Sequence, residues 1–160
     1  FMKKSLLISI DIKQDDFNLP TPEFLQEQNL AIYDLIQDNY FELVGFEEDA
    51  PYKLFFSLQE NILILEVSTE RNEVIKTFGL SMTSLRQIIN DYFTICESYF
   101  DAVKKLPLDK IEAIDMGRKG IHNEGAKVLM ERLADKIKMN LGTARRIFTL
   151  ICTLTHRRLK

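Results

Sequence analysis

The residues best suited to chemistry lie together between positions 111 and 133, in the segment IEAIDMGRKGIHNEGAKVLMERL. Within it, three glycines surround a group of polar side chains at Arg118, His122, Asn123 and Glu124. Glycine lets a backbone turn tightly, a guanidinium binds carboxylate or phosphate through paired N–H groups, and imidazole exchanges protons near neutral pH. Because binding residues concentrate in loops, the segment predicts an anion-binding loop.

A purely structural interpretation of the same residues remains open. Glycine commonly ends a helix, Asn123 can cap the next one, and Glu124 would interact favourably with that helix's dipole. Arg118 would then form an ion pair with Asp115 or Glu112. In this interpretation the segment is a tight turn between two helices and binds nothing.

A second candidate site lies at the start of the last predicted helix. Arg145 and Arg146 are in its first turn, beside backbone N–H groups of Gly142, Thr143 and Ala144 that we expect to be free. A helix N-terminus with two guanidinium groups can hold a phosphate. Alternatively, the two arginines neutralise the acidic first half of the chain.

An enzyme is the main alternative to a binding module. His122 and Glu124 would transfer protons, and Arg118 would anchor an anionic substrate. We expect no metal or cofactor, because the chain has two histidines in all and no metal-binding, phosphate-loop or dinucleotide-binding motif. Cys96 and Cys152 lie within helical apolar patterns, so buried and inert thiols are expected.

A third hypothesis is a nucleic-acid-binding helix-turn-helix. Apolar residues have the spacing with which such a motif packs its helices: Leu133, Ala134, Ile137, Met139, Ala144 and Ile147. Arg145 and Arg146 would lie on the recognition helix. However, Lys138 occupies the turn, where glycine is customary, and any two helices joined by a short turn give similar spacing. Nucleic-acid binding is therefore the least favoured function.

Composition and charge limit the class of protein. The chain has 160 residues, of which 46% are hydrophobic, and this is enough for one globular core without metal or disulfides. No apolar run is long enough to span a membrane, and we expect a cytoplasmic protein. Residues 1–100 have a net charge of −10 and residues 101–160 of +7. This asymmetry favours attraction between the two halves and between subunits of a homodimer, or an anionic partner such as a small ligand or protein.

Apolar residues alternate near the start of the chain and predict a strand: Leu6, Ile8, Ile10 and Ile12. Thr21 and Pro22 suit the N-cap and first position of a helix, whose apolar stripe we expect at Leu25, Ile32, Tyr33 and Ile36. Alternation returns in four segments, near residues 40–46, 52–58, 62–69 and 73–80. Such short connections join antiparallel neighbours, so the four segments predict a β-meander.

The second half has helical periodicity. Ser81 can cap a long helix whose apolar face comprises Leu85, Ile88, Ile89, Tyr92, Ile95, Cys96, Tyr99 and Val103. Asp109 and Glu112 have the capping-box spacing for a short helix that Gly117 and Gly120 would end. Two further helices are expected near residues 124–138 and 142–157.

Strands followed by helices favour an α+β fold. We predict a single domain over residues 1–160, with mostly strands in residues 1–80 and helices in residues 81–160. An antiparallel β-meander with an N-terminal strand and helix would be covered on one face by a C-terminal cluster of about four helices. This arrangement would bring the segment around His122 and the Arg145–Arg146 pair to a shared rim, where the site of a ligand- or protein-binding module is expected.

Three blocks of the sequence resemble a known bacterial family. The segments DYFTICESYFDAV (91–103), IEAIDMGRKGIHNEGAKVLMERL (111–133) and TARRIFTLICTL (143–154) are similar, in sequence, order and spacing, to uncharacterised protein family 0262, found mainly in alphaproteobacteria. The resemblance implies a small bacterial cytoplasmic protein. It implies no particular reaction, cofactor or catalytic residue.

Overall fold

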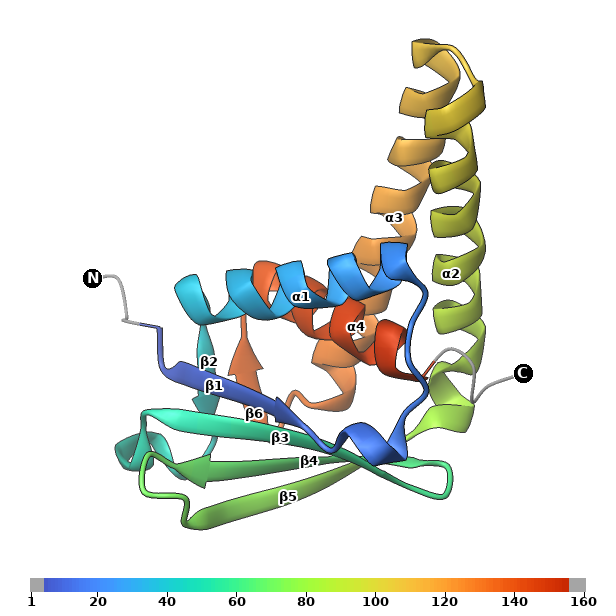
Figure 1. Ribbon diagram of the computed structural model, residues 1–160. Coiled ribbons are helices and arrows are strands. Elements are labelled where there is room, and N and C mark those ends of the chain that lie inside the picture. The colour runs from blue at the N-terminus through green and yellow to red at the C-terminus, as the bar shows by residue number, and fades with distance from the viewer. Residues whose placement is uncertain (1–4, 156–160) are drawn as a thin grey trace.

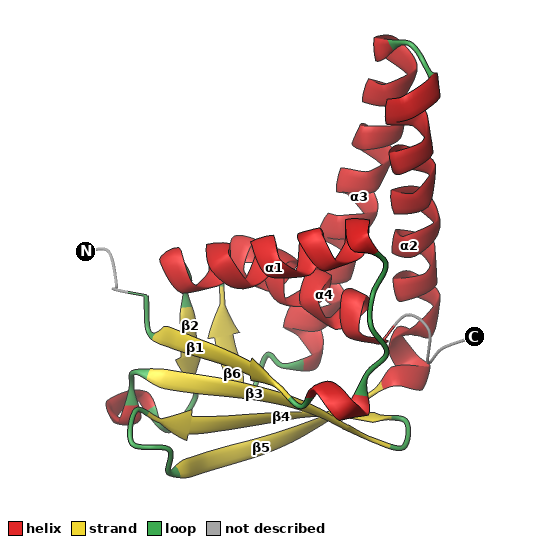
Figure 2. Ribbon diagram, in the orientation of Figure 1, coloured by secondary structure: helices red, strands yellow, loops and turns green. Residues whose placement is uncertain are grey.

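The computed structural model describes residues 5–155 (Figure 1). Its strands are β1 Leu7–Ile12, β2 Phe41–Leu43, β3 Tyr52–Gln59, β4 Ile62–Thr69, β5 Val74–Ser81 and β6 Ile137–Met139. Its helices are α1 Pro22–Gln37, α2 Met82–Lys105, α3 Leu108–Arg132 and α4 Leu141–Thr155. The predicted α+β class is confirmed, because the longer strands precede the three long helices of the second half (Figure 2).

The main sheet has the strand order β1-β3-β4-β5. β3, β4 and β5 form the predicted antiparallel meander, in which Phe56 pairs with Leu65 and Leu65 with Phe78. Glu60 and Asn72, in the two connecting turns, have positive φ angles of 57° and 66°. β1 joins the sheet parallel to β3, because the chain crosses over through α1 before it returns. The sheet is therefore mixed.

One strand predicted for the meander belongs elsewhere. The segment at residues 40–46 contributes only the short strand β2, which pairs antiparallel with β6 in a separate two-stranded sheet. Residues 137 and 138 were predicted as the end of the helix near 124–138, so β6 itself was missed. Three residues are too few to establish a period, and the pairing partner is remote in sequence, so the local pattern did not identify this pair.

Helix α1 begins as predicted and buries a different face. Thr21 Oγ1 accepts a hydrogen bond from the backbone N–H of Phe24 at 3.5 Å, and Pro22 is the first helical residue. The buried residues are Phe24, Gln28, Ala31 and Leu35, whereas Tyr33 of the predicted stripe is 62% exposed. The helix has apolar residues on two adjacent faces. On the buried face, Phe24 packs against Phe93 of α2 with ring centroids 4.2 Å apart.

Asn39 joins the end of α1 to β1. Its side-chain oxygen accepts a hydrogen bond from the backbone N–H of Leu7, and its amide nitrogen donates to the carbonyl oxygens of Leu7 and Leu35. Leu7 is completely buried, whereas its neighbour Ile8 is 37% exposed. β1 is an edge strand of the sheet. The buried side-chain amide of Asn39 pairs with backbone groups of Leu7 that would otherwise have no neighbouring strand to bond to.

Helices α2 and α3 form a long antiparallel hairpin that extends away from the sheet (Figure 1). The predicted break around residues 117–123 is wrong, because α3 continues without interruption from Leu108 to Arg132. The predicted capping box is also wrong, since Pro107 occupies the N-cap position of this helix. Val103 was predicted to face inward and is 53% exposed in the outer part of the hairpin.

Close packing explains one of the glycines inside α3. A Cβ atom at Gly125 would overlap the ring of Phe148 in α4, whereas one at Gly117 would lie at an ordinary contact distance of 3.6 Å from Ile95 of α2. Glycine makes a helix about 1 kcal/mol less stable than alanine does. The free energy gained when apolar side chains are buried at a close helix crossing exceeds that cost. Gly125 therefore permits the close approach of α3 to α4, whereas the sequence suggested that the glycines of this segment form a turn.

Helix α4 lies at the centre of the fold, against α1 and α3. Every residue from Ile147 to Thr155 is buried, and so is Ala144, so all five residues predicted to face inward are buried. Asn140 caps the helix, because its side-chain oxygen accepts a hydrogen bond from the backbone N–H of Thr143 at 2.9 Å. The buried apolar residues of the helices and the main sheet form one contiguous core.

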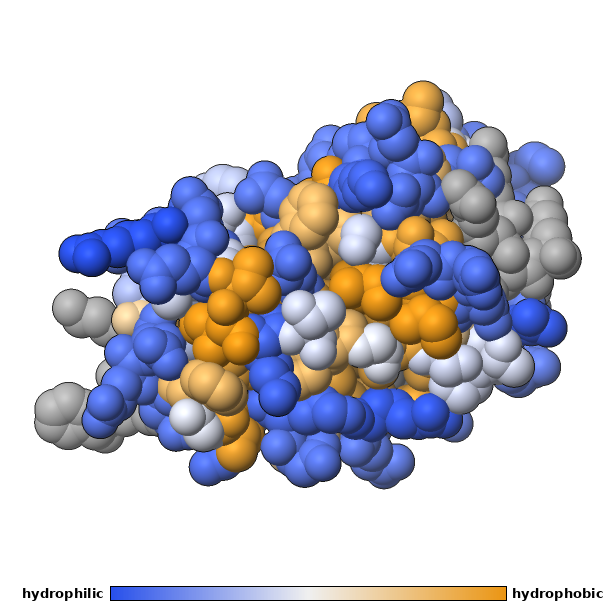
Figure 3. All heavy atoms as spheres, turned by 90° about the horizontal axis from the view of Figure 1, so that it is seen from below, coloured by the Kyte–Doolittle hydropathy of each residue, from blue (hydrophilic) through white to orange (hydrophobic). Residues whose placement is uncertain are grey.

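The other face of the main sheet is open to solvent. Residues of β3 and β4 alternate between fully and partly buried positions, and the outward positions include Phe55 and Ile64. In the view from below, apolar residues lie in separate groups between polar ones (Figure 3). One covered and one exposed face are typical of antiparallel sheets.

Candidate functional site

A cleft between α1, α3 and α4 contains three of the six residues predicted to bind or react. Its volume is about 230 Å³. The lining residues are Glu27, Leu30, Ala31, Asp34, His122, Gly142, Arg145, Arg146 and Thr149. The predicted convergence of His122 with the two arginines is therefore confirmed, although His122 lies in a helix and not in a loop.

His122 connects α3 to the first turns of α4. Its Nε2 atom lies 2.8 Å from the carbonyl oxygen of Arg145 and 2.8 Å from the hydroxyl oxygen of Thr149. Because a carbonyl oxygen can only accept, Nε2 carries the proton and donates to it. The ring stacks on Tyr92 with centroids 5.1 Å apart. The imidazole thus fixes the position of the Arg145 backbone.

Burial keeps this imidazole neutral. The pKa of His122 is lowered from 6.5 to about 4, mainly by desolvation and further by the positive charges of Arg145 and Arg118. The hydrogen bond to the Arg145 carbonyl acts in the opposite direction and is the weaker influence. At neutral pH the ring is an uncharged hydrogen-bond donor, which suits a positioning role.

Arg145 lines the cleft and carries an unsatisfied donor. Its Nε atom is buried and has no hydrogen-bond partner among residues 5–155. A buried donor without a partner costs about 1–3 kcal/mol of desolvation free energy. Any ligand that supplies an acceptor here would recover that cost.

Arg146 has a partner of its own. Its Nη1 atom donates to the carbonyl oxygen of Asp38, at 2.9 Å, where α1 ends. A cation at this position also interacts favourably with the negative end of the α1 dipole. Arg146 therefore holds α1 against α4, and Arg145 is the arginine available for a ligand.

The expected free N–H groups of α4 are largely occupied. The N–H groups of Thr143 and Ala144 donate to the side chain and the carbonyl of Asn140. Of the three residues predicted to offer donors, Gly142 alone lines the cleft. The prediction of a phosphate site built on this helix terminus is therefore wrong for Thr143 and Ala144.

Two acidic residues of the cleft were missed by the sequence analysis. Glu27 and Asp34 project from α1 and lie seven positions apart, so two helical turns bring them to the same face. The signal that could have identified them is the spacing i, i+3, i+4, i+7 of Glu27, Leu30, Ala31 and Asp34. That spacing alone does not indicate which face meets another helix.

The remaining predicted site residues do not join the cleft. The Nη2 atom of Arg118 lies 2.7 Å from Asp115, which confirms the alternative ion-pair interpretation, and its guanidinium lies 4.2 Å from the centre of the Tyr99 ring. Glu124 is exposed and follows His122 by two positions, on the other side of α3. Asn123 has a buried side-chain oxygen without a partner among residues 5–155, and it does not line the cleft.

The positions of His122, Glu124 and Arg118 are incompatible with the catalytic arrangement predicted from the sequence. Proton transfer by His122 and Glu124 with Arg118 as anchor requires the three side chains to reach a common point. Glu124 lies on a different face of the helix, and Arg118 is engaged by Asp115 one turn away. The structure therefore contradicts this enzyme hypothesis as it was formulated.

The helix-turn-helix hypothesis is also wrong. Strand β6 separates α3 from α4, so the predicted apolar positions 137 and 139 belong to a strand. A recognition helix must expose one face to the groove of a nucleic acid. In α4 the residues from 147 to 155 are all buried.

Both cysteines are buried and free, in agreement with the sequence analysis. Burial raises the pKa of the Cys96 thiol to about 11 and that of Cys152 well above its usual value. Neither thiol is a thiolate at neutral pH. Within residues 5–155, no three histidine, cysteine or acidic side chains are grouped so that they could hold a metal ion.

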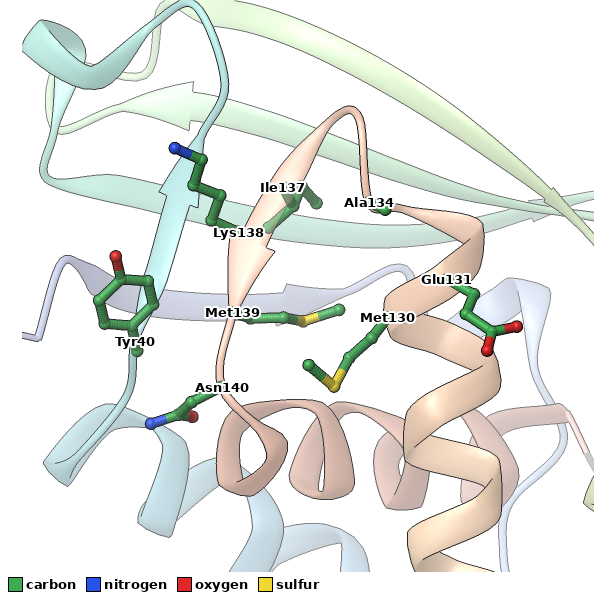
Figure 4. Close-up of a pocket in the computed structure, with 8 residues that line it drawn as sticks. All are labelled: Tyr40, Met130, Glu131, Ala134, Ile137, Lys138, Met139 and Asn140. Atoms are coloured by element: carbon green, nitrogen blue, oxygen red, sulfur yellow. The ribbon is translucent and has the colours of Figure 1, made fainter.

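A second cavity, of about 480 Å³, lies beside β6 (Figure 4). It is mainly apolar, and the side chains of Met130 and Met139 extend toward each other in it. Lys138 and Glu131 contribute the charged groups of its lining. It contains none of the residues predicted to bind a ligand, and no buried unsatisfied donor is found among its lining residues.

None of the helices in the described part of the chain combines the length and apolar character needed to cross a membrane. Fold and cleft together define a small α+β protein with a charged interhelical cleft. Residues 4–157 match the uncharacterised protein family UPF0262, and the chain belongs to this family.

Relatives in alphaproteobacteria span nearly the same length. A UPF0262 protein of Dinoroseobacter shibae is 49% identical over 151 residues, which cover 91% of this chain and 95% of the relative. A family member from Ruegeria pomeroyi is 50% identical and covers 89% and 92%, and one from Paracoccus denitrificans is 47% identical and covers 92% and 94%. No solved structure matches the chain. The resemblance seen in the sequence is thus confirmed.

Proposed function

We propose that this protein binds a small anionic ligand, a carboxylate or a phosphate ester, in the cleft between α1, α3 and α4. The observation that carries the proposal is the side chain of Arg145, which lines the cavity and whose buried Nε atom has no hydrogen-bond partner among residues 5–155. A guanidinium binds an oxyanion through two parallel N–H groups. An anion at this point would supply the missing acceptor.

The surroundings of Arg145 support a rigid binding site. His122 and Thr149 hold its backbone carbonyl through hydrogen bonds of 2.8 and 3.1 Å. The neighbouring Arg146 anchors the same turn of α4 to the end of α1. A site held from both sides loses little conformational entropy when a ligand binds.

Thermal unfolding in the presence of carboxylates and phosphates tests the proposal, since a ligand that prefers the native state raises Tm. We expect a rise for the wild type that is lost in Arg145→Met. Without ligand, Arg145→Met should be as stable as the wild type or more stable, because it removes a buried unsatisfied donor.

Arg86→Met is the matched control, because Arg86 is an exposed arginine on α2, outside the cleft. It should retain the full rise in Tm. The proposal is refuted if no carboxylate or phosphate raises the Tm of the wild type, or if Arg145→Met responds as the wild type does.

We also infer a cytoplasmic location. The two free and buried cysteines support it, because thiols persist in a reducing compartment. Fractionation of bacterial cells tests this inference, and recovery of the protein in the periplasmic fraction would contradict it.

A further inference from the structure

The walls of the cleft differ in charge. Arg145 and Arg146 project from α4, whereas Glu27 and Asp34 project from α1. No ion pair within the described residues joins an acid of α1 to an arginine of α4. Facing charges that do not pair are complementary to a ligand that carries both signs.

The relative direction of α1 and α4 places these charges along the cleft. Thr153 donates to Gln28 near the start of α1, and Arg146 donates to the carbonyl of Asp38 at its end. The two helices therefore run antiparallel, so that Asp34 lies toward the arginines and Glu27 lies farther along. At 1.5 Å per residue, the seven positions between the two acids correspond to roughly 10 Å along α1.

Apolar surface lies between the acidic groups. Leu30 and Ala31 are positioned between Glu27 and Asp34 on the same face of α1 and line the same cavity. Leu30 is 54% exposed, so its side chain offers apolar surface to a ligand in the cavity. A chain of methylene groups could cover this side chain without losing any hydrogen bond.

We propose that the ligand is an aliphatic amino acid whose amino and carboxylate groups are several carbon atoms apart. Its carboxylate binds Arg145, its methylene chain covers Leu30, and its ammonium group binds Glu27. This inference rests on the proposed anion-binding function and specifies the ligand class of the same cleft. The 230 Å³ volume accommodates a ligand of this size.

Matched pairs of probes test the inference by calorimetric titration. 4-Aminobutyrate and 6-aminohexanoate are compared with butyrate and hexanoate, which lack the ammonium group. We expect at least one of the amino acids to bind the wild type tenfold more tightly than its matched carboxylate. Glu27→Gln should abolish this preference and retain carboxylate binding, whereas Arg145→Met should abolish both.

Glu23→Gln serves as the control, because Glu23 is an exposed acid in the first turn of the same helix, outside the cleft. It should keep the tenfold preference. Equal affinity for the amino acids and the carboxylates, or an unchanged preference in Glu27→Gln, would overturn the inference and leave the anion site standing. A wild type that binds no carboxylate and no phosphate would refute the proposed function itself.

Discussion

The buried imidazole of His122 predicts a specific loss of stability in mild acid. In the folded protein its pKa is about 4, compared with 6.5 for an exposed histidine. Between these two values the unfolded chain binds more protons than the native one, so the free energy of unfolding decreases as the pH falls from 6.5 toward 4. The stabilising contribution is fully present above pH 6.5.

The magnitude follows from the two pKa values. At pH 5 the unfolded imidazole is almost fully protonated and the folded one is mostly neutral. Because the unfolded chain binds this proton and the native protein does not, the free energy of unfolding is about 2 kcal/mol lower at pH 5 than at pH 7.5 through this residue alone. That is a large part of the 5–15 kcal/mol over which single domains are stable.

His122→Gln isolates this contribution. The glutamine amide does not titrate and can still donate a hydrogen bond to the Arg145 carbonyl. Urea unfolding followed by far-UV circular dichroism, at pH 7.5 and pH 5, gives the free energy of unfolding of both proteins. The wild type should lose about 2 kcal/mol more than the variant between the two pH values.

All other titratable groups, including His156, are shared by the two proteins, so their contributions cancel in the comparison. Parallel losses, within about 0.5 kcal/mol, would refute the conclusion that the folded protein holds this imidazole neutral.

Two further predictions concern packing and buried hydrogen bonds. Gly125→Ala should lower the free energy of unfolding by about 2 kcal/mol, because the added methyl overlaps Phe148, whereas Gly120→Ala, which points into open space, should raise it by up to about 1 kcal/mol. Equal effects in urea titrations would refute the close-packing explanation. Asn39→Asp should lose about 2 kcal/mol or more at pH 7.5, since it replaces the donor to two backbone carbonyls by an acceptor. A loss below 0.5 kcal/mol would contradict this role of Asn39.

The features predicted correctly depend on residues that are close in sequence. The Thr21 cap, the ion pair of Arg118 with Asp115, and the inward face of α4 each involve groups within one or two helical turns. Their geometry follows from helix periodicity, which the sequence displays directly. The three-stranded meander is predictable for the same reason, because its turns are short.

The errors concern places where local preference and tertiary packing disagree. Glycines and a histidine in residues 117–125 favour a turn by local preference. Packing of Gly125 on Phe148 and hydrogen bonding of His122 to α4 stabilise a helix there instead. Neither partner can be identified from the segment itself, since both lie more than twenty positions away along the chain.

The candidate site illustrates the same division. The sequence identified His122, Arg145 and Arg146 by residue type, and it predicted their convergence. It did not identify Glu27 and Asp34, because an acidic pair on a helix is usually exposed to solvent. Their meeting with α4 depends on which face of α1 packs inward, and that face includes Phe24, which contacts Phe93 of α2.

The sequence by itself determined the family, the α+β class, the start of α1 and the burial of the thiols. Each of these depends on composition, on periodicity or on contacts within a few residues. The tertiary structure alone decided the pairing of β2 with β6, the continuity of α3 and the placement of basic residues of α4 opposite acidic residues of α1 in the cleft. These depend on contacts between distant segments, whose burial free energy exceeds the local preferences of about 1 kcal/mol per residue that a sequence expresses.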